Sequence, residues 1–252
     1  MLIARIVGER LKGLQLCSVD SSHDMTNAFA CTLHSSLEDQ LESSFAVADR
    51  VFVKQRIRNS TGTLHTNDGI LTFLVGTGSM MGTSEAPRQF LKAFTAPVRN
   101  LNMRVHDKQL IVKCSITGMI FDSSLVTFAD DLWKKLLVPD GSAASAHNRV
   151  MESNSILDCQ LDGHGFAQNC KKQVVVPMLR PRTENVRLRA LADGRYLVKG
   201  VWRHLGGLYS WNGSNKEERG LRLKALTKGW WELGSFWHSA SPWSVKRLMF
   251  MC

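Results

Sequence analysis

Apolar and polar residues in the first part of the chain follow a strand-like pattern, then a helix-like one, then a strand-like one again. Residues 14–19 are mainly apolar and predict a short strand that leads to Asp24. Apolar residues recur at helical spacing over 33–47, which predicts a helix there. Residues 51–57 alternate between apolar and polar, which predicts a second strand.

The next segment has the pattern of a hairpin followed by a helix. Two strand-like runs, 62–65 and 70–75, are separated by an Asn-Asp-Gly sequence that favours a tight turn. A helix is predicted over 83–99, with Ser84 as its N-cap. Strands and helices are therefore mixed along this part of the chain, as in an α+β protein.

The second half of the chain begins with a strand, an acidic turn and another strand. The strand predicted over 125–129 leads into two adjacent aspartates, and the apolar residues 132–138 follow them. A helix over 142–161 and a strand over 174–178 come next. The pattern then changes to a long amphipathic helix over 216–237. We therefore predict an α+β fold that ends in a helical segment.

The chain is strongly basic, with 32 Lys and Arg residues against 22 Asp and Glu residues and a formal net charge of +10. The surplus lies in the C-terminal half, in two groups: Lys171, Lys172, Arg180, Arg182, Arg187, Arg189, Arg195, Lys199 and Arg203, then Lys216, Arg219, Arg222, Lys224 and Lys228. A nucleic acid is a suitable partner because neutralising its phosphates releases counterions. A basic soluble protein without such a partner is the alternative.

The cysteine pattern and the N-terminal sequence predict a soluble, intracellular protein without a membrane partner. The six cysteines are scattered and form no CxxC motif, which argues against a zinc site and a disulfide framework. Charged residues interrupt the N-terminal sequence, so no signal-peptide apolar region forms. No apolar run approaches the length of a membrane span.

Asp130 and Asp131 are the most suggestive acidic residues, because they stand together at the end of an apolar strand. Two adjacent carboxylates repel each other, and a divalent cation removes that penalty. Mg²⁺ prefers carboxylate oxygens and substrate phosphates as ligands. An Asp-Asp pair is also common in a solvated turn, so the pair alone leaves both interpretations open.

The sequence around this pair resembles a motif of a known enzyme family. Phe128, Ala129, Asp130, Asp131 and Leu132 resemble the aromatic-Ala-Asp-Asp box of reverse transcriptases, in which the two aspartates lie on a β-turn of the palm. The resemblance implies that Phe128 and Ala129 border the substrate site. It also implies a third carboxylate upstream, on a neighbouring strand.

Asp24 is in the position for this third carboxylate. Asp24, Ala28, Phe29 and His34 keep the spacing of the first palm motif of the family. Ala30 departs from it, because an aspartate is usual there. The resemblance implies that Asp24 is the first catalytic aspartate and that Phe29 is the steric gate against the ribose 2′-hydroxyl. A buried packing role for Phe29 is compatible with that assignment.

A Gly-rich loop and the helix after it resemble the family's Gln-Gly-Asp-Pro-x-Ser-Pro motif. Gly82, Pro87 and Phe90 are in register with that motif, whereas three neighbouring positions differ. A loop without side-chain bulk can approach a nucleotide or a template base closely. The resemblance therefore implies that Gly82 and Pro87 border the substrate site, and an ordinary loop with a capped helix is the alternative.

Two further matches lie downstream. Asn169 and Lys172 keep the spacing of the fourth motif, Gly-x-x-x-Asn-x-x-Lys, which implies that Lys172 lies near the leaving pyrophosphate. A solvated basic pair is the alternative for this segment. His204, Leu205 and Gly206 resemble the Tyr-Leu-Gly hairpin that grips the primer, with His in place of Tyr.

Together these motifs imply an RNA-directed DNA polymerase of the non-LTR retrotransposon (LINE-like) type. Residues 1–213 would be the palm, an antiparallel sheet with helices packed on one face, and 214–252 would begin a helical thumb. Asp24, Asp130 and Asp131 would bind Mg²⁺ (or Mn²⁺). The partners would be an RNA template, a DNA primer and a dNTP.

Only 23 residues precede Asp24, whereas this family has a fingers subdomain there. We therefore expect a fragment of a longer retrotransposon protein that depends on fingers or other polyprotein regions. Two alternatives stay open. One is an inactive retroelement remnant that binds nucleic acid through its basic half, and the other is an unrelated basic α+β binding module.

Overall fold

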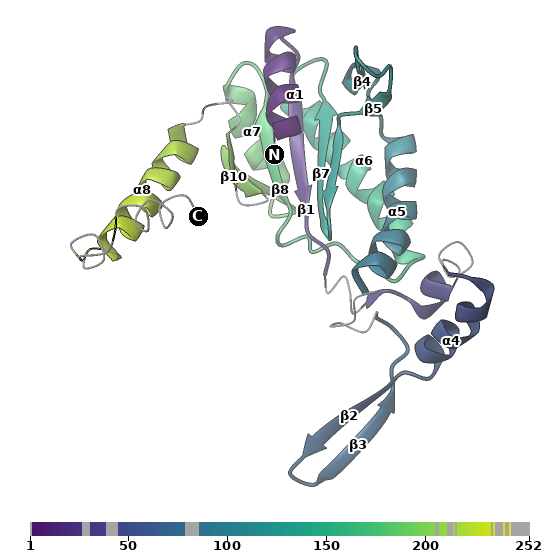
Figure 1. The fold of residues 1–252 in the computed structure, drawn as a ribbon. Coiled ribbons are helices and arrows are strands. Elements are labelled where there is room, and N and C mark those ends of the chain that lie inside the picture. Colours follow the sequence, from purple (N-terminus) through teal and green to yellow (C-terminus); the bar gives the residue numbers. More distant parts are fainter. Residues whose placement is uncertain are drawn as a thin grey trace. The chain divides into compact units, whose positions relative to one another are not determined.

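The computed structural model describes most of the chain (Figure 1). The described residues are 2–26, 31–38, 45–78, 86–204, 207–210, 214, 216–232, 234, 239 and 242. By its internal contacts the chain divides into two compact units, Leu2–Gly200 and Val201–Cys252, with Met1 grouped with the second. This division does not identify subdomains, so the palm–thumb boundary between 1–213 and 214–252 stays a prediction.

A five-stranded sheet with the strand order β6-β7-β1-β8-β9 forms the centre of the first unit. The strands are β1 (Ser18–His23), β6 (Leu125–Phe128), β7 (Asp131–Leu137), β8 (Val174–Met178) and β9 (Leu197–Val198). All neighbouring pairs are antiparallel except β8 and β9, which are parallel. β1 therefore lies in the middle, between β7 and β8 (Figure 1).

The side chains of β1 alternate between the two faces of this sheet. Val19 belongs to the same hydrophobic core as Leu132 and Leu136 of β7. Asp20 is the next residue, and it pairs in register with Lys135 of β7. Because neighbouring residues of a strand point to opposite faces, Asp20 and Lys135 lie on the face opposite to Val19.

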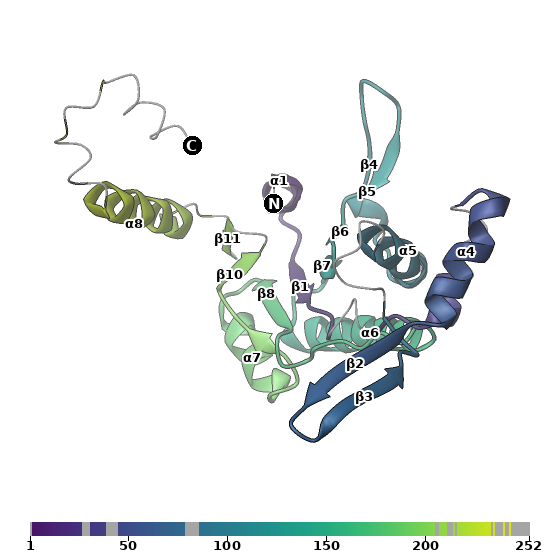
Figure 2. The same ribbon diagram turned by 60° about the horizontal axis from the view of Figure 1, so that its bottom comes forward.

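Helices cover the face on which Val19 lies. They are α5 (Ala86–Arg104), α6 (Ala143–Asp162) and α7 (Thr183–Ala192). α6 packs against α5, α7 and β1, and Figure 2 shows it beside β1 and α5. A shorter helix, α1 (Leu2–Gly13), contributes to a separate small core with Leu137. The predicted α+β class, with helices packed on one face of a mainly antiparallel sheet, is confirmed.

The remaining elements lie outside the five-stranded sheet. In the first unit they are α4 (Val47–Arg58), β2 (Thr61–Thr66), β3 (Gly69–Leu74), η1 (Lys108–Leu110), β4 (Ile111–Lys113) and β5 (Ile120–Asp122). In the second unit they are β10 (Val201–His204), β11 (Gly207–Ser210) and α8 (Lys216–Glu232). Among the described strands, β2 and β3 pair only with each other, as do β4 with β5 and β10 with β11 (Figure 2).

Most predicted elements are present. The hairpin of β2 and β3, the strands β6, β7 and β8, and the helices α5, α6 and α8 overlap the predicted ranges. The predicted N-cap of α5, Ser84, lies outside the described residues. Residues 34–38 are helical, and 39–44 of the same predicted helix lie outside the described residues. The predicted strand over 14–19 begins only at Ser18. None of the helices in the described ranges is long and apolar enough to cross a membrane.

The strand predicted over 51–57 is wrong, because these residues lie in α4. Their alternation does not mark a buried strand face, since Val51 and Phe52 are both exposed. A helix instead places Arg58 where its guanidinium donates two hydrogen bonds to Glu38, at 2.6 and 2.7 Å. Alternation over a short segment therefore did not distinguish a buried strand from an exposed helix.

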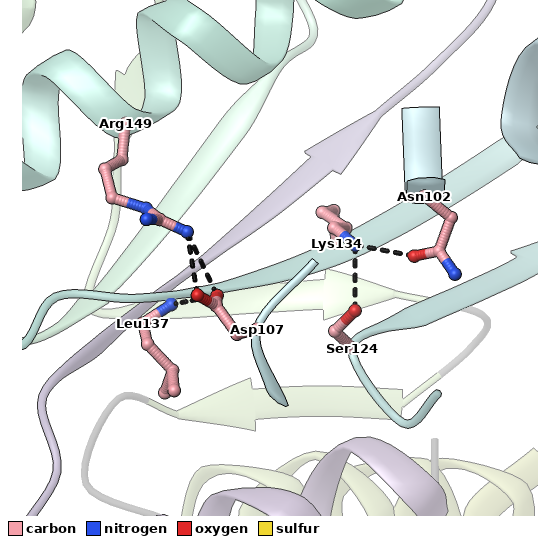
Figure 3. Close-up of polar contacts among 6 residues, drawn as sticks. All are labelled: Asn102, Asp107, Ser124, Lys134, Leu137 and Arg149. Carbon is pink, nitrogen blue, oxygen red and sulfur yellow. Dashed lines mark hydrogen bonds and ion pairs between the residues drawn. The ribbon is translucent and has the colours of Figure 1, made fainter. Parts of the chain in front are cut away.

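Polar side chains fasten α5, β7 and α6 together (Figure 3). Asp107, just after α5, accepts hydrogen bonds from Arg149 of α6 at 2.9 and 3.1 Å. The same carboxylate accepts from the backbone N–H of Leu137 at 3.0 Å. Lys134 of β7 donates to Asn102 Oδ1 of α5, at 2.8 Å. These contacts fix β7 to two helices, and β7 begins at Asp131.

Lys134 makes the stability of this region depend on pH. Its side chain is 1% exposed, and burial lowers the pKa of its ammonium group from 10.5 to about 8. The unfolded chain therefore binds more protons than the folded chain between pH 8 and 10.5, and stability rises with pH in that window.

We expect Lys134→Met to remove this gain. In urea denaturation, the free energy of unfolding of the unmodified chain should rise by about 2 kcal/mol more than that of the variant between pH 7.5 and 9.5. Lys113→Met changes an exposed lysine of β4 and is the matched control, for which no such difference is expected. A Lys134→Met variant with the unmodified pH dependence would contradict this account.

Candidate active site

Asp24 follows directly after β1. The regular register between β1 and β7 ends with His23 opposite Leu132. The next step of the same ladder places Asp24 opposite Asp131, the first residue of β7. Alternation along β1 also puts Asp24 on the face that carries Asp20, opposite to the face covered by α5, α6 and α7. The pairing of β1 with β7 thus brings two distant sequence motifs together.

The second aspartate of the pair is presented by a tight turn. Phe128 of β6 pairs with Asp131 of β7, so only Ala129 and Asp130 connect the two strands. Ala129 has a φ of 52°, a left-handed conformation that costs a non-glycine residue about 1 kcal/mol or more. Phe128 is 65% exposed at the end of β6. The turn therefore holds a strained alanine directly beside two carboxylates.

The three carboxylates lie close enough to influence one another. Burial raises the pKa of the Asp131 carboxyl, and the negative charges of Asp130 and Asp24 raise it further. The Lys172 ammonium acts in the opposite direction and lowers it. Mutual repulsion of this kind makes the cluster a site that favours cations.

Lys172 supplies a positive charge to this cluster. Its Nζ atom lies 2.9 Å from Asp24 Oδ2, and the hydrogen bond and charge of Asp24 raise the pKa of the lysine. Asp130 and Asp131 raise the same pKa by smaller amounts. The lysine side chain is 65% exposed and that of Asp24 is 26% exposed, so the pair is open to solvent and to exchange with another cation.

The segment that carries Lys172 is held beside Asp24 by backbone contacts. The backbone N–H of Asn169 donates to the Asp24 carbonyl at 2.8 Å. Its side-chain amide also lies 3.4 Å from Asp24 Oδ2. The neighbouring residues Met25 and Gln168 form an antiparallel bridge. The fourth motif and the first motif are thus adjacent in space.

The donor chemistry of the cluster fits a hard divalent cation, because carboxylate oxygens are the ligands that Mg²⁺ prefers. In the described ranges, no group of three or more His, Cys, Asp or Glu side chains is arranged to hold a metal ion. Asp24 Oδ2 instead contacts Lys172. A cation that bound Asp24 Oδ2 would exchange with this ammonium group, and the assignment of metal ligands stays a prediction.

The other predicted site residues fall into two groups. Pro87 is exposed in the first turn of α5, and Phe90 of the same helix is fully buried in the core. Phe90 stacks on a second phenylalanine of α5, with 5.3 Å between ring centroids. The second group lies outside the described residues or side chains: Phe29, Gly82, Leu205, Gly206 and the side chain of His204. His204 itself ends β10, opposite Gly207 of β11.

Two polar pairs beside the site were not predicted from the sequence. Lys135 Nζ lies 2.5 Å from Asp20 Oδ1, and both side chains are almost completely buried. The two residues lie on β7 and β1, four positions along these strands from Asp131 and Asp24. His23 Nδ1 lies 2.6 Å from Gln168 Oε1. The sequence signals were weak: a lysine in the mainly apolar segment after Asp131, and a histidine directly before Asp24.

Telomerases are among the known structures with a similar fold. A telomerase from Candida tropicalis truncated from its C-terminal domain matches with a TM-score of 0.53 and 12% identity, over 83% of this chain and 38% of that one. A Candida albicans telomerase in complex with the TWJ fragment of telomeric RNA matches with a TM-score of 0.52 and 15% identity, over 83% of this chain and 33% of that one.

The corresponding Candida tropicalis complex gives a TM-score of 0.54 at 11% identity, over 83% of this chain and 32% of that one. No family model and no curated protein sequence matches the chain. The chain spans about a third of the length of the telomerases that it matches, 32% to 38%. At this level of identity the likeness concerns the fold, and the chain has a reverse-transcriptase-like fold.

Proposed function

We propose that this chain is an RNA-directed DNA polymerase domain that transfers a nucleotide from a dNTP to a primer 3′-hydroxyl. The observation that carries the proposal is the meeting of Asp24 with Asp131 across β1 and β7, with Lys172 on the same carboxylate. The reverse-transcriptase-like fold supports it. The complexes of two similar telomerases with telomeric RNA support an RNA template as partner.

In the proposed reaction, Asp24 and Asp130 would hold divalent cations, Mg²⁺ or Mn²⁺, and Asp131 would assist them. Such cations would supply a lower pKa for the attacking hydroxyl and stabilisation of charge on the leaving oxygens. Lys172 would stabilise negative charge on the leaving pyrophosphate, and it would be free to do so where a cation took its place at Asp24. Phe29 excludes the ribose 2′-hydroxyl in this scheme, which rests on the motif resemblance.

The origin in a non-LTR retrotransposon is part of the same proposal. It is supported by the order of the five motifs along the chain, from Asp24 to the hairpin at His204. Fingers or other regions of a longer protein are the proposed partners of this domain. Gly82, Pro87 and the hairpin residues Leu205 and Gly206 would border the nucleotide and the primer.

A second function, nucleic-acid binding without catalysis, is supported by the charge of the chain. The formal net charge is +10, and the arginines of α7 that follow its first turn are exposed. Such a surface binds phosphates without reading sequence. This function needs no divalent cation at the carboxylates.

Extension of a DNA primer on an RNA template tests the two functions. We expect the chain to incorporate dNTPs with Mg²⁺ or Mn²⁺ and to lose this activity with EDTA. Binding of the same hybrid, measured as a function of salt, is the companion assay. Salt-sensitive binding without incorporation under any of these conditions would replace the polymerase proposal with the second function.

A further inference from the structure

His23 lies on the face of β1 that packs on the helices, opposite to the face of Asp24. Its ring is 1% exposed, and Nδ1 lies 2.6 Å from Gln168 Oε1. Because an amide oxygen only accepts hydrogen bonds, the histidine donates from Nδ1. The residue next to Asp24 is therefore bonded to a residue of the segment that carries Lys172.

The orientation of the Gln168 amide is fixed from its other end. Its Nε2 atom donates to Asp158 Oδ1 at 2.8 Å and to the backbone carbonyl of Asn154 at 3.2 Å, both on α6. These acceptors require the nitrogen on their side, which leaves the oxygen for His23. Gln168 thus ties the end of β1 to α6 through a single side chain.

Gln168 is also the central residue of the backbone segment beside Asp24. It forms the antiparallel bridge with Met25. On one side, the Thr26 N–H donates to the Ala167 carbonyl at 2.9 Å, and on the other, Asn169 donates to the Asp24 carbonyl at 2.8 Å. A shift at Gln168 would therefore move both neighbours of the bridge at once.

The position of Lys172 depends on the backbone segment around Gln168. Its backbone N–H donates to the Asn169 carbonyl at 2.9 Å, so a turn connects the bridged segment to the lysine. An ion pair in which the lysine is 65% exposed is too weak to order a loop by itself. The contact between Lys172 and Asp24 therefore requires that the backbone already be held in position.

We infer that His23 and Gln168 are a positioning pair, which holds the 167–172 segment so that Lys172 reaches Asp24. The pair touches neither substrate nor cation and acts through Lys172 and Asp24. Its catalytic consequence rests on the proposed function, whereas the positioning itself does not.

Zero-length carbodiimide cross-linking tests the positioning without any need for activity, because it joins amines and carboxylates in contact. In the unmodified chain without divalent cations, we expect an amide between Lys172 and Asp24, detected by peptide mass spectrometry. Gln168→Met and His23→Leu should each lower its yield at least fivefold. His23→Asn places an amide donor near the position of Nδ1 and should restore most of the yield.

Two controls separate positioning from general unfolding. The pair of Lys54 and Glu38, at 3.6 Å, gives a reference cross-link elsewhere in the same unit, which should not change in any variant. Gln160→Met removes another α6 hydrogen bond, that of Asn100 to Gln160 at 2.9 Å, and should leave the Lys172 cross-link intact. An unchanged Lys172 yield in Gln168→Met and His23→Leu, or equal losses in His23→Leu and His23→Asn, would overturn the inference.

Single-turnover incorporation measures the consequence for catalysis. Gln168→Met should lower the maximal rate by about tenfold or more with little change in the dNTP concentration for half-maximal rate, because the lysine acts on the leaving group. In a Lys172→Ala background the same change should cost little. If the unmodified chain incorporates nothing, the proposed function fails, and the cross-linking result still decides the positioning.

Discussion

Replacing Asp130 with Asn is expected to reduce dNTP incorporation by about a thousandfold or more, equivalent to roughly 4 kcal/mol of lost transition-state stabilisation. Asn keeps the size of the side chain and the turn between β6 and β7, but it removes a negative charge from the carboxylate cluster. This charge acts on the neighbouring carboxyl, because burial raises the pKa of Asp131 and the negative charge of Asp130 raises it further.

The measurement is primer extension at saturating Mg²⁺ and dNTP. Asp193→Asn is a matched control, since Asp193 is an exposed carboxylate in a left-handed conformation that Asn also adopts readily, at the end of α7. It should keep full activity. Normal synthesis by Asp130→Asn would remove this residue from the mechanism.

Replacing Lys135 with Met is expected to lower the free energy of unfolding by about 3–5 kcal/mol, because it leaves the Asp20 carboxylate without its buried ammonium partner. Lys135 is 0% exposed and Asp20 is 1% exposed. Burial lowers the pKa of Lys135 more than Asp20 raises it, so the ammonium pays a desolvation cost that the pair does not fully offset.

The double variant Asp20→Val, Lys135→Met should therefore recover most of the lost stability. It removes both charges and places an apolar side chain next to Val176 of β8, which pairs with position 20. Urea denaturation of the two variants and the unmodified chain gives the comparison. A single variant that loses less than about 1 kcal/mol, or a double variant as unstable as the single one, would contradict this view of the pair.

The ion pair of Asp20 and Lys135 is linked to the candidate site, because it lies on the same two strands as Asp24 and Asp131. They face each other in the β1–β7 register. A slip by one residue would move Asp20 to the apolar face and separate Asp24 from Asp131. A buried ion pair that costs stability is thus well placed to specify the register on which the carboxylate cluster depends.

Sequence patterns predicted the central part of the fold because its strands and helices are bounded by clear signals. The two aspartates after an apolar run correctly marked the turn from β6 to β7, and the strand over 174–178 is β8 as predicted. Ser142 caps α6 by accepting a hydrogen bond from the Ser145 N–H. Each of these elements is specified by residues close to it in sequence.

Other features depend on contacts between distant residues, which a local pattern does not reveal. α4 was predicted as a strand because its short alternation fits both structures, and its pairing with Glu38 is visible only in three dimensions. Lys134 and Lys135 lie within the apolar segment predicted over 132–138, and both are buried by partners more than ten positions away, such as Asn102 and Asp20.

The aspartates and the lysine of the candidate site could be identified from the sequence. The residues that hold them in position could not. The spacing of the motifs identified Asp24, Asp130, Asp131 and Lys172, which the structure places together. The supporting role of Gln168 had no signal, because it depends on two hydrogen bonds to α6 and on one to a strand far away in sequence. Chemical roles for all these residues stay predictions until activity is measured.

Binding of Mn²⁺, followed by electron paramagnetic resonance, tests most directly whether Asp24, Asp130 and Asp131 form one cation site. We predict that Asp24→Asn and Asp130→Asn each weaken the same binding event at least tenfold, whereas Asp193→Asn leaves it unchanged. An unaltered Mn²⁺ affinity in Asp24→Asn, beside a clear loss in Asp130→Asn, would show that the two strands do not share a site.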